Sequence, residues 1–398
     1  GQSGAVDGGY SIILSPASSA DAAYEGLDPA DVSVNSLADR AAVVWPADNA
    51  GQVNVSPALQ VAVTNTAAGN LTVTFYGRVA PTLFPGPDFC LSVMPDTQMY
   101  TGLLGGGTSN MMIAQTEWAI SNRLTRNIPY VTQLGDISNN GDTPSYVFQW
   151  YNATNAMYRL ENASRTGLAE GMPYGVAVGN HEETPNSWAT CGTTGTTNAG
   201  TTTNYNKYFG VPHFSGRAYY GGHYSTNNNN HFDFFSAGGL DFLVLYFEYN
   251  TNMTSALLEW AQAVLATNAD RRVIVVTHNM GNTQTPVVWS DQAQTLYDTF
   301  KDNTNVFLFL GGHVTGQGRR EDTYNGHTIR TLVQDYQGWT KGGNGFLRLL
   351  DFSPSNNVVV AQTYSPVTGE YLTDETSELY FPYDMQPTGP GAAAAFVA

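Results

Sequence analysis

The chain has 398 residues and carries 33 acidic against 16 basic side chains, which gives a formal charge of −17 at pH 7. This length exceeds the usual size of one domain, so we expect one large domain and a smaller one. The acidic balance argues against a nucleic-acid-binding surface and against a patch for anionic membranes. No run of residues is long and apolar enough to predict a membrane span.

Neutral polar residues supply most of the polarity, because charged side chains make up only 12% of the chain. Lysine occurs only at positions 207, 301 and 341, and this composition is typical of a secreted or cell-surface protein. The first residue is Gly rather than Met, which is compatible with a signal peptide that has been removed. Sequons at Asn54, Asn70, Asn152, Asn162 and Asn252 permit glycosylation, although a chain so rich in Asn and Thr contains several by chance.

The amino-terminal part predicts β structure without a complete domain of its own. Residues 1–40 are rich in Ala, Ser and Asp and predict a tail, a linker or a single added strand. Residues 41–86 contain two runs of alternating apolar and polar side chains and resemble part of an immunoglobulin-like module. The predicted strands are too few for a sandwich, so this region must pair with the large domain, with residues 1–40 or with another chain. The last alternative would make the protein a homo-oligomer.

Strands alternate with helices over residues 87–385, which indicates an α/β domain. Residues 109–127 predict an amphipathic helix whose buried stripe includes Leu124. Residues 184–230 predict a long, weakly structured, Thr/Asn/Gly-rich insert near the functional site. Residues 386–398 predict a Pro/Gly/Ala tail.

Two further helices and the cysteines complete the pattern. Pro144 suits the first turn of a helix, and Thr254 predicts the cap of another that runs to Thr267. The two cysteines are Cys90 and Cys191. A disulfide between them and two unrelated thiols remain equal alternatives, because the sequence cannot fix pairing.

Five short apolar runs each end in side chains that can bind a metal ion. Open α/β sheets place their chemistry at the carboxyl ends of their strands, so five such endings in order indicate a built site. The segments are Asp96-Thr97-Gln98, Gly135-Asp136, Gly179-Asn180-His181-Glu182, His278 and Gly312-His313-Val314-Thr315.

The order of these motifs closely resembles the calcineurin-like metallophosphoesterases, over roughly residues 88–385. The resemblance implies an α/β fold in the form of a four-layer sandwich, with two mixed β-sheets flanked by helices, and a centre for one or two divalent metal ions. The chain departs from the family pattern twice. Gln98 and Thr315 stand where the family usually has histidines.

The resemblance implies one complete half of the metal centre. Asp136 would bridge the two metals, and Asn180, His278 and His313 would complete one site. Two imidazoles, a carboxylate and an amide oxygen suit Zn, Mn or Fe.

The other half has lost both of its histidines. Asp96, Asp136 and the side-chain oxygen of Gln98 form a set that contains only oxygen donors, which suits Mg, Mn or Ca. Thr315 is more easily explained as an outright loss than as a ligand, because a neutral hydroxyl coordinates poorly.

The leading hypothesis is a secreted metal-dependent phosphoesterase that acts on phosphate mono- or diesters. By resemblance, His181 would act near the leaving-group oxygen and Glu182 would orient it. The first alternative is an extracellular structural or assembly protein on the same scaffold, with weak or lost activity. The second is a metal-dependent module that binds glycans or phosphate without turnover.

The remaining candidates have simpler interpretations. The Arg319-Arg320 pair could hold a phosphate, but surface arginines are the favoured interpretation. Asp335-Tyr336-Gln337 lies near the predicted site, and we slightly favour a tight turn over a functional role. Four histidines outside the motifs are interpreted as structural or surface residues: His213, His223, His231 and His327.

Overall fold

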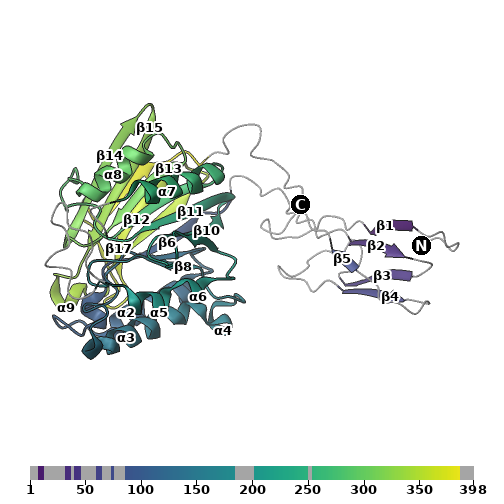
Figure 1. Ribbon diagram of the computed structural model, residues 1–398, viewed down its shortest axis with the longest axis horizontal. Coiled ribbons are helices and arrows are strands. Elements are labelled where there is room, and N and C mark those ends of the chain that lie inside the picture. Colours follow the sequence, from purple (N-terminus) through teal and green to yellow (C-terminus); the bar gives the residue numbers. More distant parts are fainter. Residues whose placement is uncertain are drawn as a thin grey trace. The chain divides into compact units, whose positions relative to one another are not determined.

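The computed structural model describes residues 86–183, 201–249 and 253–385 in full, together with the backbone of five strands nearer the amino terminus (Figure 1). The chain divides into two units, one of Gly1–Leu83 with Pro387–Ala398 and the other of Phe84–Gln386. The second unit corresponds closely to the α/β domain predicted at residues 87–385. Cys191 and the predicted tail lie outside the described residues, and Cys90 is buried without a disulfide partner among the described ones.

The amino-terminal strands form two small antiparallel sheets within the described residues. The first sheet has the order β1-β2-β5, and in the second β3 pairs with β4. The bounds are β1 Gly8–Ile12, β2 Val32–Ser36, β3 Arg40–Trp45, β4 Gln60–Thr64 and β5 Val73–Phe75. Strands from the segments predicted separately as 1–40 and 41–86 therefore share one sheet. The immunoglobulin-like character of this region stays a prediction.

The first large sheet begins the α/β unit and has the order β18-β17-β16-β6-β7-β8, with β19 also paired to β17. Its strands β6, β7 and β8 are parallel, and β16 runs antiparallel to β6. The bounds are β6 Phe89–Met94, β7 Val131–Gln133, β8 Tyr174–Val176, β16 Leu347–Ser353, β17 Val358–Ser365, β18 Glu370–Leu372 and β19 Glu378–Pro382. The sheet is therefore mixed, with its parallel part at the strands that precede the predicted motifs.

The second large sheet has the order β14-β15-β13-β12-β11-β10-β9 and is also mixed. Strands β11, β12, β13 and β15 are parallel, while the outer pairs are antiparallel. The bounds are β9 Tyr220–His223, β10 His231–Ala237, β11 Leu240–Phe247, β12 Arg272–Thr277, β13 Val306–Gly311, β14 Gly316–Tyr324 and β15 His327–Asp335.

Helices cover the outer faces of the two sheets, as Figure 1 shows for α2 and α3 on one side and α7 and α8 on the other. One apolar core joins α2 and α3 to the first sheet and fills the space between the sheets, and a second lies between the second sheet and α7 and α8. The predicted fold of two mixed β-sheets flanked by helices is confirmed. The longer helices are α2 Ser109–Asn122, α3 Val147–Met157, α7 Ser255–Thr267 and α8 Asp291–Phe300.

The shorter helices lie mainly around the first sheet. Their bounds are α1 Gln98–Thr101, η1 Pro144–Tyr146, η2 Tyr158–Glu161, α4 Ala163–Thr166, α5 Thr203–Phe209, α6 Val211–Phe214 and α9 Thr340–Gly343. Pro144 and Thr254 have their predicted positions, since Pro144 begins η1 and the Thr254 hydroxyl accepts a hydrogen bond from the Leu257 amide at the start of α7. No helix in the described ranges has the length and hydropathy needed to cross a bilayer.

Two local predictions were wrong. Helix α2 ends at Asn122, so Leu124 is 78% exposed instead of buried, and Ile128 takes the buried position after the turn. The segment predicted as a weakly structured insert contains α5, α6 and β9 from residue 203 onward, and it buries Tyr205, Phe209 and Phe214. The Thr, Asn and Gly residues of this segment favoured a loop, although its aromatic side chains Tyr205 and Phe209 could be interpreted as packing residues, and both are buried. The part from 184 to 200 lies outside the described residues.

Candidate metal centre

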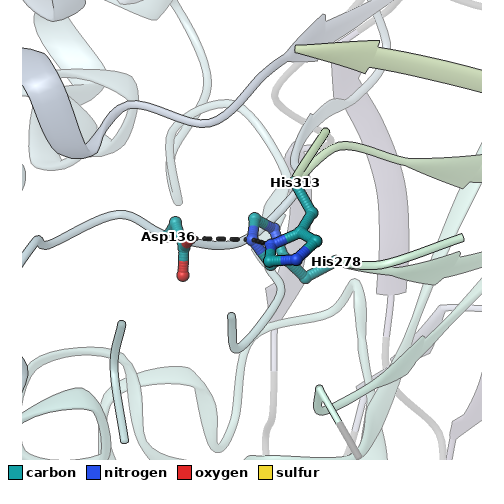
Figure 2. Close-up of side chains that lie close together, drawn as sticks. All are labelled: Asp136, His278 and His313. Carbon is teal, nitrogen blue, oxygen red and sulfur yellow. Dashed lines mark hydrogen bonds and ion pairs between the residues drawn. The ribbon is translucent and has the colours of Figure 1, made fainter. Parts of the chain in front are cut away.

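Three predicted ligands come together at the carboxyl ends of strands from both large sheets. Asp136 follows β7 in the first sheet, and His278 and His313 follow β12 and β13 in the second. Their ligand atoms all lie within 4.8 Å of one another (Figure 2). The strand-end pattern in the sequence therefore reflects a real convergence in space.

Asp136 and His278 form a buried ion pair in this cluster. The His278 Nε2 atom lies 2.8 Å from Asp136 Oδ2, and neither side chain is more than 1% exposed. The other imidazole nitrogen, Nδ1, donates to the Leu134 carbonyl at 2.8 Å. Because a carbonyl oxygen can only accept, this bond fixes the proton on Nδ1 and aims Nε2 at the site. His313 Nδ1 lies 3.2 Å from His278 Nε2.

The proximity of these groups sets their charges. Burial alone would raise the pKa of Asp136, but His278 and then His181 and His313 hold it well below its usual range. Burial alone would lower the pKa of His278, but the Asp136 carboxylate outweighs it and raises the pKa. Burial and the neighbouring His278 lower the pKa of His313 to about 4. His313 is therefore a neutral imidazole at neutral pH, the form that binds a metal ion.

Two glycines allow the backbone to approach this closely. Gly135 has a φ of +96°, and a Cβ there would lie 2.7 Å from His278 Nδ1. A Cβ at Gly179 would overlap Asp136 Oδ1. Asp136 itself has a φ of 51°, which is unusual for a residue other than glycine. Strained backbone of this kind clusters at functional sites, where the surrounding structure holds it in place.

Glu182 supplies that support. Its carboxylate accepts hydrogen bonds from the backbone amides of Asp136, Ser138 and Gly179, each at 2.8 Å. Burial and the Asp136 charge raise the pKa of Glu182 to about 8, and the backbone donors oppose this rise. The side chain thus ties the loops after β7 and β8 together.

His181 is held by a different group from the one expected. Its Nδ1 lies 2.7 Å from the Asn139 carbonyl, which fixes the proton on Nδ1, and its backbone amide donates to Asp136 Oδ1 at 2.8 Å. The resemblance assigned the orientation of His181 to Glu182. The hydrogen bonds assign it to Asn139, and they assign Glu182 to the positioning of Asp136.

Asp96 and Gln98 lie in the same buried region. Asp96 is 1% exposed and Gln98 is 4% exposed. The Gln98 backbone amide donates to Asp96 Oδ1 at 3.0 Å, and its Nε2 donates to Asp96 Oδ2 at 3.2 Å and to Gln337 Oε1. The pKa of Asp96 is raised well above its usual value by burial and then by the carboxylates of Asp335 and Asp136. These acidic groups therefore lie close enough to repel one another.

The remaining predicted residues are less closely involved. Asn180 is buried in the loop after β8, at 3% exposure. Thr315 is exposed and lies against Gly338, where a Cβ would be 2.7 Å from the Thr315 hydroxyl. Arg320 pairs with Asp322 and lies over the Trp289 ring, so its contacts are those of a surface arginine.

The histidines outside the motifs have structural contacts. His213 pairs with Glu161 at 2.6 Å, and His231 stacks on Tyr246. His223 lies 3.0 Å from the Tyr220 hydroxyl, and His327 contacts the Val306 carbonyl.

The end of β15, where the sequence favoured a tight turn, carries a buried carboxylate. Asp335 is fully buried, and its carboxylate accepts from the Gln337 backbone amide at 2.7 Å and from Gln337 Nε2 at 3.0 Å. The signal was present, because Asp335-Tyr336-Gln337 repeats the spacing of Asp96-Thr97-Gln98 at another strand end. Tyr249, whose ring centroid lies 5.3 Å from that of His313, had no motif to reveal it.

The donor atoms fit a divalent metal ion. Asp136, His278 and His313 offer one carboxylate and two imidazoles within a single coordination sphere, which suits a borderline metal such as Zn. Neighbouring groups hold these donors in place, since the Leu134 carbonyl fixes the His278 tautomer and the Glu182 carboxylate binds the Asp136 backbone amide.

Comparison of the sequence with known proteins finds a relative but assigns the chain to no family. No model of a known protein family matches the chain. The uncharacterized protein YvnB of Bacillus subtilis (strain 168) is 30% identical over 310 residues, which cover 74% of this chain and 22% of the relative. The chain thus spans less than a quarter of the length of this curated relative.

Solved structures with a similar arrangement include proteins described as phosphatases or phosphoesterases. A dimetal phosphatase from Danio rerio is 13% identical, with a TM-score of 0.44, and the match covers 75% of this chain and 100% of that one. The anchor in the inner membrane complex of Plasmodium is 14% identical, with a TM-score of 0.42 and coverage of 75% and 90%. A predicted phosphoesterase from Streptococcus pneumoniae is 9% identical, with a TM-score of 0.30 and coverage of 74% and 98%.

Proposed function

We propose that this chain contains a metal-dependent phosphoesterase that hydrolyses phosphate mono- or diesters. The convergence of Asp136, His278 and His313 at the carboxyl ends of strands from both sheets carries this proposal. A buried site with two imidazoles, a carboxylate and a separate histidine at its edge contains the groups that metal-assisted hydrolysis requires.

Each residue has a definite role in this proposal. Asp136, His278 and His313 would hold a Zn, Mn or Fe ion together with Asn180, and Asp96 and Gln98 would hold a harder ion such as Mg, Mn or Ca. The bound ions would supply an activated water and would stabilise negative charge on the phosphate oxygens.

His181 is the proposed general acid. Its Nδ1–H donates a hydrogen bond to the Asn139 carbonyl, so Nε2 is the nitrogen that would exchange a proton with substrate. In the protonated imidazole, Nε2 would give its proton to the leaving-group oxygen as the phosphorus–oxygen bond breaks. The hydrogen bond from the His181 backbone amide to Asp136 fixes the base of this side chain beside the metal ligands.

Hydrolysis of nitrophenyl phosphate and bis-nitrophenyl phosphate, with Zn, Mn, Mg or Ca added, tests the proposal. We expect turnover with at least one ion, and a fall of about 10²- to 10⁴-fold in kcat for His181→Ala at unchanged metal content. Folded, metal-loaded protein that hydrolyses neither ester would refute the proposal and would favour the structural or ligand-binding alternatives.

We also propose that the protein acts outside the cell. The scarcity of lysine and the dominance of neutral polar side chains support this location. Fractionation of a host culture with an antibody to the chain tests it, and recovery only from the cytosolic fraction would refute it.

A further inference from the structure

The chain contains two Asp-X-Gln units that a hydrogen bond joins directly. One follows β6 of the first sheet and the other contains the last residue of β15 in the second. In both units the backbone amide of the glutamine donates to one oxygen of its aspartate, and the side-chain amide donates to the other oxygen. Gln98 Nε2 also donates to Gln337 Oε1, so a direct hydrogen bond links the two units.

This arrangement concentrates negative charge where the resemblance led us to expect two histidines. Asp96, Asp136 and Asp335 are each at most 1% exposed. Burying several carboxylates without a compensating cation is strongly unfavourable, and a bound metal ion is the usual compensation. The loss of two neutral imidazole ligands is thus accompanied by an additional carboxylate.

An independent observation points to a ligand in this cluster. The Gln98 side chain is almost fully buried, and its Oε1 atom has no hydrogen-bond partner among the described residues. Its Nε2 atom is held by Asp96 and Gln337, so the amide cannot turn to exchange the two atoms without losing both bonds. A buried carbonyl oxygen whose orientation is fixed and whose lone pairs are unused is a donor for a hard cation.

We infer that Asp335 is a ligand of the second metal ion, in an oxygen-only site formed with Asp96 and Gln98 Oε1. Gln337 is a positioning residue, because its two hydrogen bonds fix the Asp335 carboxylate and its Oε1 accepts from Gln98. The site would take a hard divalent cation such as Mn²⁺, Mg²⁺ or Ca²⁺. This inference rests on the two-ion centre of the proposed function and adds to it a ligand that the family resemblance does not supply.

Direct measurement of Mn²⁺ binding tests the inference without reference to activity. The full chain, freed of metal and supplied with Zn²⁺ for the imidazole half, is titrated with Mn²⁺ while electron paramagnetic resonance reports the free ion. We expect the native chain to bind Mn²⁺ and Asp335→Asn to bind it at least about tenfold more weakly, with unchanged zinc content. Gln337→Ala keeps the carboxylate and should have a smaller effect.

Asp374→Asn is the matched control. Asp374 makes a similar turn, in which Oδ1 accepts from the Thr376 amide at 3.0 Å, but it precedes β19 outside the carboxylate cluster. This substitution should leave Mn²⁺ binding unchanged. Native-like Mn²⁺ affinity in Asp335→Asn would overturn the inference even if the enzyme hydrolyses esters. Mn²⁺ binding that is lost in Asp335→Asn would support it even if no ester is turned over.

A second measurement needs no variant and so does not depend on Asp335→Asn folding. Anomalous scattering from native crystals soaked in Mn²⁺ should give a peak bonded to oxygens of both Asp96 and Asp335. A peak bonded to Asp96 and Asp136 alone would overturn the inference, as would the absence of any peak beside Gln98.

Discussion

At the scale of single residues, the buried pair of Asp136 and His278 connects the stability of the protein with its metal chemistry. Without a metal ion, each side chain compensates the buried charge of the other. With an ion bound, both would become ligands, and His278 would have to release its Nε2 proton. Asp136 and His278 therefore form an ion pair in the metal-free protein and would both be ligands in the metal-bound protein.

Removing one member of this pair should affect both properties. We expect His278→Ala to lower the free energy of unfolding by about 3–5 kcal/mol in metal-free protein, because Asp136 would remain buried without its partner. Bound zinc should fall as well, which urea unfolding in EDTA and elemental analysis would measure.

His327→Ala provides the control for removal of a histidine. Within the described part of the chain, the His327 imidazole hydrogen-bonds to the Val306 carbonyl and lies outside the cluster. Its loss should cost about 1 kcal/mol and leave zinc content unchanged. Equal zinc content in the two variants would contradict the assignment of His278.

The buried titratable groups predict that metal-free protein loses stability between about pH 7 and pH 8. The pKa of Glu182 is raised to about 8, chiefly by burial, and Asp136 raises the pKa of His278 against the effect of burial. In this range the folded chain holds protons that the unfolded chain has released, so stability falls by about 1.4 kcal/mol per pH unit for each such proton.

The groups with lowered pKa values do not cancel this trend. The pKa values of His313, His231 and His327 are lowered, the first two to about 4 and about 3, so above about pH 7 these imidazoles are mostly neutral in both the folded and the unfolded state. Urea unfolding in EDTA at several pH values checks the prediction, and a rise in stability toward pH 8 would contradict it. Bound zinc should reverse the slope, because its ligands must be deprotonated.

At the scale of elements, a close backbone contact and a set of hydrogen bonds hold the loops after β7 and β8 together. Gly179 leaves space for the Asp136 carboxylate, and Glu182 binds the backbone amides of both loops. Each strand is only three residues long, so these loops, rather than extended pairing, fix the positions of the ligands.

A methyl group at Gly179 should therefore damage the site. We expect Gly179→Ala to displace Asp136, to reduce zinc affinity at least about tenfold and to destabilise the fold by about 1–3 kcal/mol through overpacking. Calorimetric zinc titration and thermal unfolding would measure the two effects.

Gly326→Ala is the control that distinguishes the steric effect of a methyl group on Asp136 from the general cost of replacing a glycine. Gly326 has a φ of +80°, but a Cβ there would meet nothing within 4 Å. Alanine should cost about 1–2 kcal/mol at this position without changing zinc affinity. Unaltered zinc affinity in Gly179→Ala would contradict the proposed close contact with Asp136.

At the scale of the whole molecule, the proposed metal ligands and both apolar cores belong to the unit Phe84–Gln386. We therefore expect a chain without Gly1–Leu83 to fold, to bind the same amount of zinc and to unfold within a few degrees of the full chain. Metal analysis and calorimetry check this, and an insoluble or zinc-free product would show that the site depends on the first unit.

Comparison of the two chains by light scattering would also test assembly. The sequence left a homo-oligomer formed through the amino-terminal strands as one alternative. Strand β1 pairs with β2 of the same chain, so these strands already have intramolecular partners. Equal monomeric masses with and without Gly1–Leu83 would argue against assembly through this region.

The sequence by itself determined the fold class and the residues of the Asp136, His278 and His313 cluster. Strands such as Phe89–Met94 and Arg272–Thr277 form continuous apolar runs, because both faces of a strand in a covered sheet are buried, and their ends are marked by polar residues. Asp136, His278 and His313 could therefore be predicted from local pattern alone. Leu124 and the segment from residue 203 could not, because the end of α2 and the packing of isolated aromatics depend on distant contacts.

Only the tertiary structure decided how the altered half of the site is completed. Asp335 lies 239 positions after Asp96, and nothing in the local sequence shows that β6 and β15, in different sheets, end beside each other. The hydrogen bond from Gln98 to Gln337 makes that proximity visible. Local pattern reports which side chains end a strand, but the packing of the two sheets determines which of those ends meet.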